Sequence, residues 1–171
     1  MKDSTKFIIA TILYIIWTFG VINYASASPA EDFKKYAFRA QVLEVIYGPP
    51  ASVQLAQSYC ETNHGRADTI GDLYNNWFSI MDFNTDYWEY GSGPAMNWNK
   101  TRSYTWRRYS YPLISWIDHA YFLWLYNPEY RYRSYLFWCN NPVKYGRRGY
   151  WSKIERTIKK YNLQKYDIFK Q

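Results

Sequence analysis

Among the carboxylates of this chain, Glu61 stands in a position that suits acid catalysis. It lies in the stretch LAQSYCETNHG, at the predicted end of a helix whose apolar stripe contains Val53, Ala56 and Cys60. The C-terminal end of a helix disfavours an ionised acid and therefore raises its pKa. An acid that keeps its proton near neutral pH can protonate a leaving oxygen, as glycosidases require. Taken alone, a glutamate at a helix end is more often a solvated surface group.

Four blocks of the sequence resemble, in the same order, those of the bacterial endo-β-N-acetylglucosaminidases that cleave peptidoglycan, glycoside hydrolase family 73. The blocks are SVQLAQSYCETNHGRA, NNWFSI, WRRYSYPLISWIDHAYFL and GYWSKIERTIKKYNL, and together they cover about residues 50–163. The first is similar to the family motif L-A-Q-x-x-x-E-x-x-x-G, so the resemblance implies that Glu61 is the general acid. The second is similar to Asn-x-Phe-Gly-Ile, with Ser79 in place of the glycine. The resemblance also implies an α+β, mainly α, lysozyme-like fold with a small β-hairpin lobe beside a helical lobe.

A second catalytic group is harder to identify. Most glycosidases use two carboxylates, yet the segment MNWNKTRSYT, where many relatives carry acids, contains none. We expect Glu89 to be the second acid, with Asp82 and Asp86 as alternatives. The acetamido group of the substrate is another alternative, since it can act as an internal nucleophile. The resemblance further implies a catalytic tyrosine near the closing helix, which Tyr145 matches best.

The same resemblance suggests which side chains bind the sugar. Asn76, Trp77 and Phe78 would form the floor of a cleft, although Asn76 could instead brace the junction between the lobes. Tyr109 belongs to the block that is similar to Phe-Arg-x-Tyr, and Tyr150 matches the second tyrosine near the closing helix. In a chain with 20 tyrosines, simple packing explains Tyr150 equally well.

Several other polar residues have structural interpretations. Asp118 and His119 follow one another on a predicted helix, but no serine nucleophile motif accompanies them, so we expect them to be core or bracing groups. The basic pair Arg107 and Arg108 is expected to be solvated, or to grip an acidic wall polymer. The sequence has no Cys/His cluster with metal-ligand spacing, and neither a metal nor another cofactor is expected.

A mainly helical frame must position these residues. Hydrophobic periodicity and helix stop signals predict helices at about 29–47, from Pro50 to the NHG turn at Gly65, from Pro112 through Leu123, at 128–138 and at 149–163. Alternation from 101 to 106 predicts a strand, and the Gly/Pro cluster before it predicts a loop or hairpin turn.

The N-terminus has the three parts of a secretory signal. Lys2 and Lys6 precede an apolar run at 7–22, and small residues then offer a cleavage site before Ser28. We therefore expect a signal peptide at 1–27, or alternatively an uncleaved signal anchor, followed by one catalytic domain at 28–171. The protein would be exported to the periplasm, the cell envelope or the medium, and only an uncleaved N-terminal segment would contact a membrane.

The amino-acid composition limits the kinds of binding partner that suit this chain. The chain carries 21 Lys and Arg against 14 Asp and Glu, and it contains 9 Trp, 20 Tyr and 9 Phe. Positive charge and exposed rings suit glycan strands of the wall or nucleic acid, and the export signal argues against nucleic acid. We expect a monomer that binds peptidoglycan. Cys60 and Cys139 could form one disulfide after export, or remain as two buried thiols.

Three functions compete on these observations. The first is hydrolysis of the β-1,4 bond after N-acetylglucosamine. A muramidase or lytic transglycosylase of the same fold is the second, because it can place one glutamate at a helix end in the same way. The third is a catalytically silent glycan-binding module that keeps the aromatic side chains but lacks a second acid.

Overall fold

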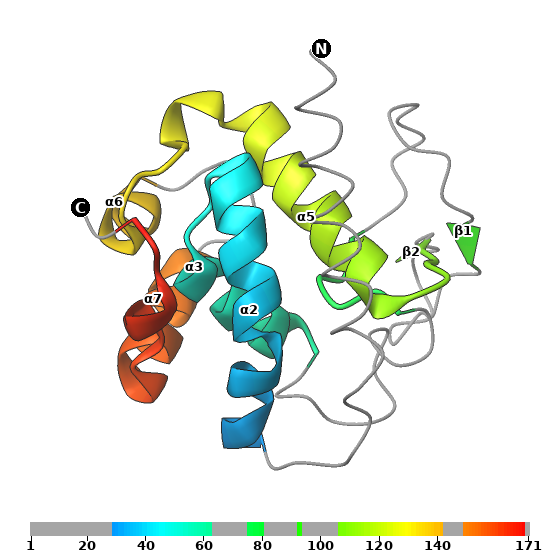
Figure 1. The fold of residues 1–171 in the computed structure, drawn as a ribbon, viewed down its shortest axis with the longest axis horizontal. Helices are drawn as coiled ribbons and strands as arrows, with labels where there is room; N and C mark the ends of the chain where they lie inside the picture. Colours follow the sequence, from blue (N-terminus) through cyan, green and yellow to red (C-terminus); the bar gives the residue numbers. More distant parts are fainter. Residues whose placement is uncertain (1–28, 63–74, 81–91, 94–105, 142–148, 170–171) are drawn as a thin grey trace.

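The computed structural model describes residues 29–62, 75–80, 92–93, 106–141 and 149–169. Within these ranges the chain is mainly helical, as expected from the sequence (Figure 1). The helices are α2 (Pro29–Tyr47), α3 (Ala51–Glu61), α5 (Pro112–Tyr126), α6 (Tyr135–Asn140) and α7 (Tyr150–Tyr161), with 3₁₀ turns η1 (Pro128–Tyr130) and η2 (Leu163–Tyr166).

Helix α3 is the centre of the described fold. It packs against α2, α6, α7 and η2, and Figure 1 shows it behind α2 and beside α7. Every residue from Ala51 to Ser58 is buried, so the helix has no solvent-facing side before its last turn. The predicted apolar stripe is therefore only part of what this helix buries.

The other helices bury one face each. Ala37, Ala40 and Leu43 face inward from α2, and the corresponding residues of the later helices are Trp116, Ala120, Leu123, Ile154 and Ile158. Ile46 follows Val42 and Leu43 at helical spacing in the sequence but is 36% exposed. The stripe instead passes through Tyr47, which packs against the core and follows Leu43 by one helical turn.

Gly48 reverses the chain between α2 and α3. Its φ is +97°, a conformation that glycine adopts without steric cost. A Cβ at this position would lie 2.4 Å from Cγ of Arg131, so another residue would collide with that side chain. The carbonyl of Gly48 also accepts a hydrogen bond from the backbone N–H of Tyr132 at 3.0 Å. The helix predicted at about 29–47 thus ends where expected, directly before Gly48, Pro49 and Pro50.

The helix predicted at 128–138 forms as two shorter pieces. The η1 turn ends at Tyr130, Tyr132 then adopts a φ of +58°, and α6 starts after Ser134, whose hydroxyl accepts a hydrogen bond from the N–H of Phe137 at 3.4 Å. A left-handed residue cannot continue a right-handed helix, so the periodic pattern is interrupted.

Two short strands form an antiparallel pair beside the helices. β1 (Ser92–Gly93) pairs with β2 (Trp106–Arg107), with Ser92 opposite Arg107. The rest of the expected hairpin lobe, Gly65 and the expected signal segment at 1–27 lie outside the described residues. No helix in the described ranges has the length and apolar character needed to cross a membrane.

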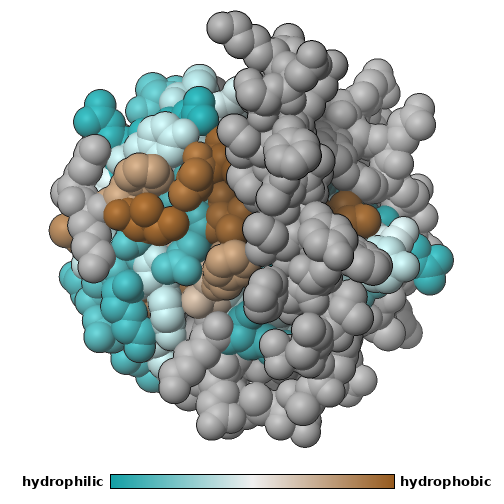
Figure 2. All heavy atoms as spheres, in the orientation of Figure 1, coloured by the Kyte–Doolittle hydropathy of each residue, from teal (hydrophilic) through white to brown (hydrophobic). Residues whose placement is uncertain are grey.

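Some large aromatic side chains remain on the surface. Phe38 on α2 is 47% exposed, and Tyr111 just before α5 is 69% exposed. Figure 2 shows apolar residues gathered around α2 on the described part of that face.

A buried carboxylate fastens the C-terminal segment to the core. Glu44 is 1% exposed and accepts hydrogen bonds from the backbone N–H groups of Ala51 at 3.0 Å, Ile168 at 3.1 Å and Phe169 at 3.0 Å. The C-terminal segment also carries Asp167, which accepts from the N–H and the hydroxyl of Ser52. Both acids thus hold the end of the chain against the start of α3.

Replacing Glu44 with Gln should lower the free energy of unfolding by ~2–4 kcal/mol, because an amide NH₂ would face backbone N–H donors that then lack an acceptor. Urea denaturation would measure this change. Glu155→Gln is the matched control, since it removes an exposed i,i+4 ion pair with Lys159 and should cost ~0.3–0.5 kcal/mol. Equal losses in the two variants would contradict this account of Glu44.

Candidate active site

Glu61 is the last residue of α3 and is half-buried. The helix ends directly after it because Thr62 turns out of the helical conformation. The N–H of Thr62 donates to the carbonyl of Ser58 at 3.0 Å, and its hydroxyl donates to the same oxygen at 2.8 Å. The cap is therefore made by Thr62, and it fixes where the carboxyl of Glu61 leaves the helix.

Three residues from two other segments surround the carboxyl of Glu61. Burial raises its pKa above the ordinary value. The neighbouring hydroxyls of Tyr150 and Ser79 and the positive charge of Lys153 act in the opposite direction. The upward effect is the larger. Tyr150 is the first residue of α7 and Lys153 follows it by about one turn, so α7 brings both side chains to the end of α3.

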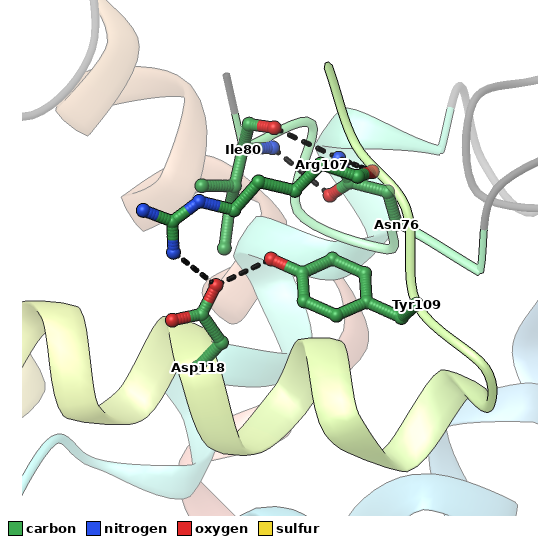
Figure 3. Close-up of polar contacts among 5 residues, drawn as sticks. All are labelled: Asn76, Ile80, Arg107, Tyr109 and Asp118. Carbon is green, nitrogen blue, oxygen red and sulfur yellow. Dashed lines mark hydrogen bonds and ion pairs between the residues drawn. The ribbon is translucent and has the colours of Figure 1, made fainter. Parts of the chain in front are cut away.

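Asn76 holds the turn that carries Ser79. Its amide donates to the carbonyls of Ile80 at 2.9 Å and Arg107 at 3.0 Å, and its oxygen accepts from the N–H of Ile80 at 2.9 Å (Figure 3). The side chain is completely buried. The bracing interpretation therefore describes Asn76 better than contact with a sugar does.

Two of the aromatic residues expected to bind sugar are buried in the core. Phe78 is 0% exposed and Tyr109 is 3% exposed, which leaves neither ring a face for a ligand. They are internal because Phe78 stacks on His119 at a centroid distance of 3.8 Å, and the hydroxyl of Tyr109 donates to Asp118. Trp77 is half-buried against the ring of Tyr36, with the centroids 4.7 Å apart.

Arg107 and Asp118 form a buried ion pair that ties β2 to α5. Nη1 of Arg107 lies 2.6 Å from Oδ2 of Asp118, and the side chains are 3% and 0% exposed. Figure 3 shows the hydroxyl of Tyr109 directed at the same carboxylate oxygen. The expectation that Arg107 is solvated is wrong, because a carboxylate on α5 draws it inward. Arg108, its neighbour, is exposed.

His119 has no place in acid–base chemistry at neutral pH. It is completely buried, and burial lowers its pKa to about 3. The ring is therefore neutral and serves as a flat packing surface for Phe78. Together with the pairing of Asp118, this agrees with the expectation of core and bracing roles.

The possible disulfide is not formed. Cys60 and Cys139 are both free, half-buried thiols. The sulfur of Cys60 lies 3.5 Å from Oγ1 of Thr157 on α7, whereas the charges acting on Cys139 are Glu155 and Lys159 of the same helix. Thr157 lies two positions from both Glu155 and Lys159, and residues two apart point to different sides of a helix. Cys60 and Cys139 therefore approach α7 from different sides.

Several expected site residues lie outside the described ranges. They are Glu89, Tyr145, Asp82 and Asp86. Across the described ranges, no group of three or more His, Cys, Asp or Glu side chains could hold a metal ion.

Neither Lys153 nor Ser79 was expected at the site from the sequence, where Ser79 stood out only as the replacement of a glycine. Spacing offers a signal for Lys153, which follows the expected site residue Tyr150 by three positions on one predicted helix and so shares its face. For Ser79 the signal is the departure itself from Asn-x-Phe-Gly-Ile, since the serine adds a hydroxyl where the block has none.

Comparisons with known proteins agree with this architecture. The family model described as mannosyl-glycoprotein endo-beta-N-acetylglucosaminidase matches residues 37–163. No curated protein sequence gives a significant match.

Solved structures share the fold at low sequence identity. The catalytic domain of the autolysin Auto from Listeria monocytogenes has a TM-score of 0.60 at 18% identity, covering 98% of each chain. The glycoside hydrolase domain of Salmonella typhimurium FlgJ has a TM-score of 0.61 at 18% identity, covering 80% of this chain and 90% of its own. A peptidoglycan hydrolase from Sphingomonas sp. A1 has a TM-score of 0.56 at 20% identity, covering 77% and 88%.

Proposed function

Because the chain belongs to the mannosyl-glycoprotein endo-beta-N-acetylglucosaminidase family, we propose that it is a peptidoglycan hydrolase that cleaves the β-1,4 bond after N-acetylglucosamine. Glu61 would be the general acid of this reaction. We further propose that its substrate is the glycan strand of the wall and that the protein acts as a monomer.

The observation that carries the proposal is the environment of Glu61. Its carboxyl is half-buried at the end of α3 beside Tyr150, and burial raises its pKa. A general acid works best when it still holds its proton near the operating pH. In the proposed step, the proton of Glu61 passes to the glycosidic oxygen while the bond from that oxygen to the anomeric carbon breaks, and the carboxylate remains.

The positive charge that develops on the sugar needs a second group. We propose Glu89 for this role and Tyr145 as an assisting residue, with Asp82, Asp86 or the acetamido group of the substrate as alternatives. All of these protein residues belong to the part of the sequence expected to form the small β lobe or the loop before α7. Tyr150 would contact both Glu61 and the substrate, and the half-buried Trp77 is the remaining aromatic candidate of its block.

We also propose that the protein is exported. A hydrolase of wall polymer must reach a substrate outside the cytoplasm, and the apolar run after Lys2 and Lys6 offers a route. We propose that residues 1–27 act as a signal peptide or anchor and that 28–171 form the catalytic domain.

The chemistry of the new chain ends tests which bond is cut. Purified peptidoglycan would be digested with the exported protein, reduced with borohydride and analysed by mass spectrometry. Glucosaminidase activity predicts reduced N-acetylglucosamine at the ends. Reduced N-acetylmuramic acid would favour a muramidase, and anhydromuramic ends would favour a lytic transglycosylase. Co-sedimentation with peptidoglycan without released fragments would favour a silent binding module.

A further inference from the structure

The C-terminal end of α2 meets two distant segments of the chain at one exposed surface. Nη2 of Arg131 donates to the carbonyl of Ile46 at 3.0 Å. The hydroxyl of Tyr132 donates to the carbonyl of Val45 at 3.2 Å, and the ring of Tyr132 lies against that of Phe169 with the centroids 4.8 Å apart. We call this surface the terminal patch, and its members are Val45, Ile46, Arg131, Tyr132, Ile168 and Phe169.

Large apolar side chains of the terminal patch face solvent. Val45 and Ile168 are each 47% exposed, and Ile46 is also exposed. Figure 2 shows apolar residues together over the C-terminal part of α2 and beside the C-terminal segment. Because direct contacts join these segments, the side chains form one area, unlike the single exposed apolar residues that most surfaces carry.

The backbone at this end of α2 has its carbonyls paired within the protein. The last carbonyls of a helix need partners from outside it. Here the carbonyl of Glu44 accepts from the N–H of Gly48 at 2.8 Å, and the side chains of Tyr132 and Arg131 donate to the next two. A water-poor environment can therefore cover this helix end without leaving those groups unpaired.

Exposed cations accompany the apolar area. They are Arg131, Arg133 and Lys165. The carboxylates of Glu44 and Asp167 are buried and accept from backbone N–H groups, so they face inward. Among the described residues, the exposed acid nearest to these arginines along the chain is Glu129. The outward charge of this surface is therefore positive.

We propose that the terminal patch is a docking surface for an anionic lipid bilayer, in addition to the contact expected from the N-terminal segment. Aliphatic and aromatic side chains favour the boundary between headgroups and acyl chains, and arginine and lysine bind anionic headgroups. An anionic wall polymer would attract the same cations but offers the aliphatic side chains no apolar layer to enter.

Docking at this surface leaves the proposed active site free. Ala51, the first residue of α3, donates its N–H to Glu44 beneath the terminal patch. Glu61 lies at the other end of the same helix, ~15 Å away along its axis. The inference does not depend on the catalytic role of Glu61.

Two double variants of the full-length protein test the two parts of the surface by co-sedimentation with vesicles. Ile46→Ser with Ile168→Ser should weaken binding to vesicles that contain phosphatidylglycerol by ~5–20-fold. Arg133→Gln with Lys165→Gln should weaken it by ~10–30-fold at low salt and leave binding to phosphatidylcholine vesicles unchanged. Tyr111→Ser, at a 69% exposed residue just before α5, is the matched control and should bind as the wild type does.

Photocrosslinking provides a second readout that separates the terminal patch from the N-terminal segment. Every variant keeps residues 1–27, so that segment contributes equally to all of them. With p-benzoylphenylalanine in place of Ile168, illumination should attach phosphatidylglycerol to the protein, whereas the same group in place of Tyr111 should attach none.

Unchanged vesicle binding by both double variants, with no lipid attached at Ile168, would overturn the inference. Binding of purified anionic wall polymer, again with no lipid attached at Ile168, would also overturn it and would assign the terminal patch to that polymer. The proposed function is tested separately by Glu61→Gln on purified walls, which contain no bilayer, so the two failures are distinguishable.

Discussion

Glu61→Gln is expected to reduce hydrolysis of purified cell walls by ~10²–10⁴-fold, the range that a positioned general acid contributes. Glutamine has almost the same shape but cannot release a proton to the glycosidic oxygen. A turbidity assay on purified walls would measure the loss, and far-UV circular dichroism would show whether the helices remain. Glu155→Gln, at the surface of α7, is the matched control and should retain wild-type activity. Wall clearance at the wild-type rate by Glu61→Gln would remove this residue from the mechanism.

The same substitution should stabilise the protein at neutral pH. Folding raises the pKa of Glu61 above its ordinary value of 4.5, so the folded protein holds this proton more tightly than the unfolded chain does. The resulting loss of folding stability is absent below the ordinary pKa. It grows as the pH rises from the ordinary pKa to the folded pKa, and it is constant above that. Glu61→Gln should therefore raise Tm at pH 7 and have little effect near pH 4. A lower Tm at pH 7 would contradict the burial of this carboxyl.

Asp118→Asn is expected to cost ~3–5 kcal/mol of unfolding free energy, because it removes the carboxylate charge that pairs with the buried guanidinium of Arg107. The hydroxyl of Tyr109 would also lose the carboxylate to which it donates. Since Arg107 carries the backbone groups that bind Asn76 and Ile80, activity should fall as the turn with Ser79 loosens. Chemical denaturation and the turbidity assay would record both effects.

A combined replacement tests whether the cost comes from the uncompensated charge. The triple variant Arg107→Met, Tyr109→Phe, Asp118→Leu replaces the three polar side chains that meet at Asp118 with apolar ones. Its loss of stability should be much smaller than the sum of the single losses, because no buried charge is left alone. Additive losses would mean that the ion pair does not act as a unit.

Local sequence signals were sufficient for most helix boundaries. The GPP stop ends α2 at Tyr47, Pro112 begins α5, and Gly149 precedes α7 with a φ of +82°. These features act through backbone sterics of one or two residues, so they do not depend on the rest of the fold. The expectation that Glu61 lies at the end of a helix is correct, but the helix ends at Thr62, through hydrogen bonds to the carbonyl of Ser58, before the predicted NHG turn is reached.

The candidate site was less predictable from the sequence, because its residues come from segments that are far apart in the chain. In a sequence, an aromatic residue of the core looks the same as one that lines a cleft, so the pattern could not distinguish the two places for Phe78 and Tyr109. Only the stacking of Phe78 on His119 and the pairing of Tyr109 with Asp118 show that both are internal. Arg107 looked solvated because arginine side chains usually are, and its partner Asp118 lies on a separate element, α5.

The sequence by itself determined the helical periodicity, the family resemblance and the place of Glu61 at the end of a helix, since each follows from the order of neighbouring residues. Only the tertiary structure decided that α3 is buried on every side as far as Ser58, that Arg107 is internal and that Ser79, Tyr150 and Lys153 act on the carboxyl of Glu61. The physical reason is that periodicity shows which face of a helix is apolar, but burial and pKa depend on how many other elements pack around it.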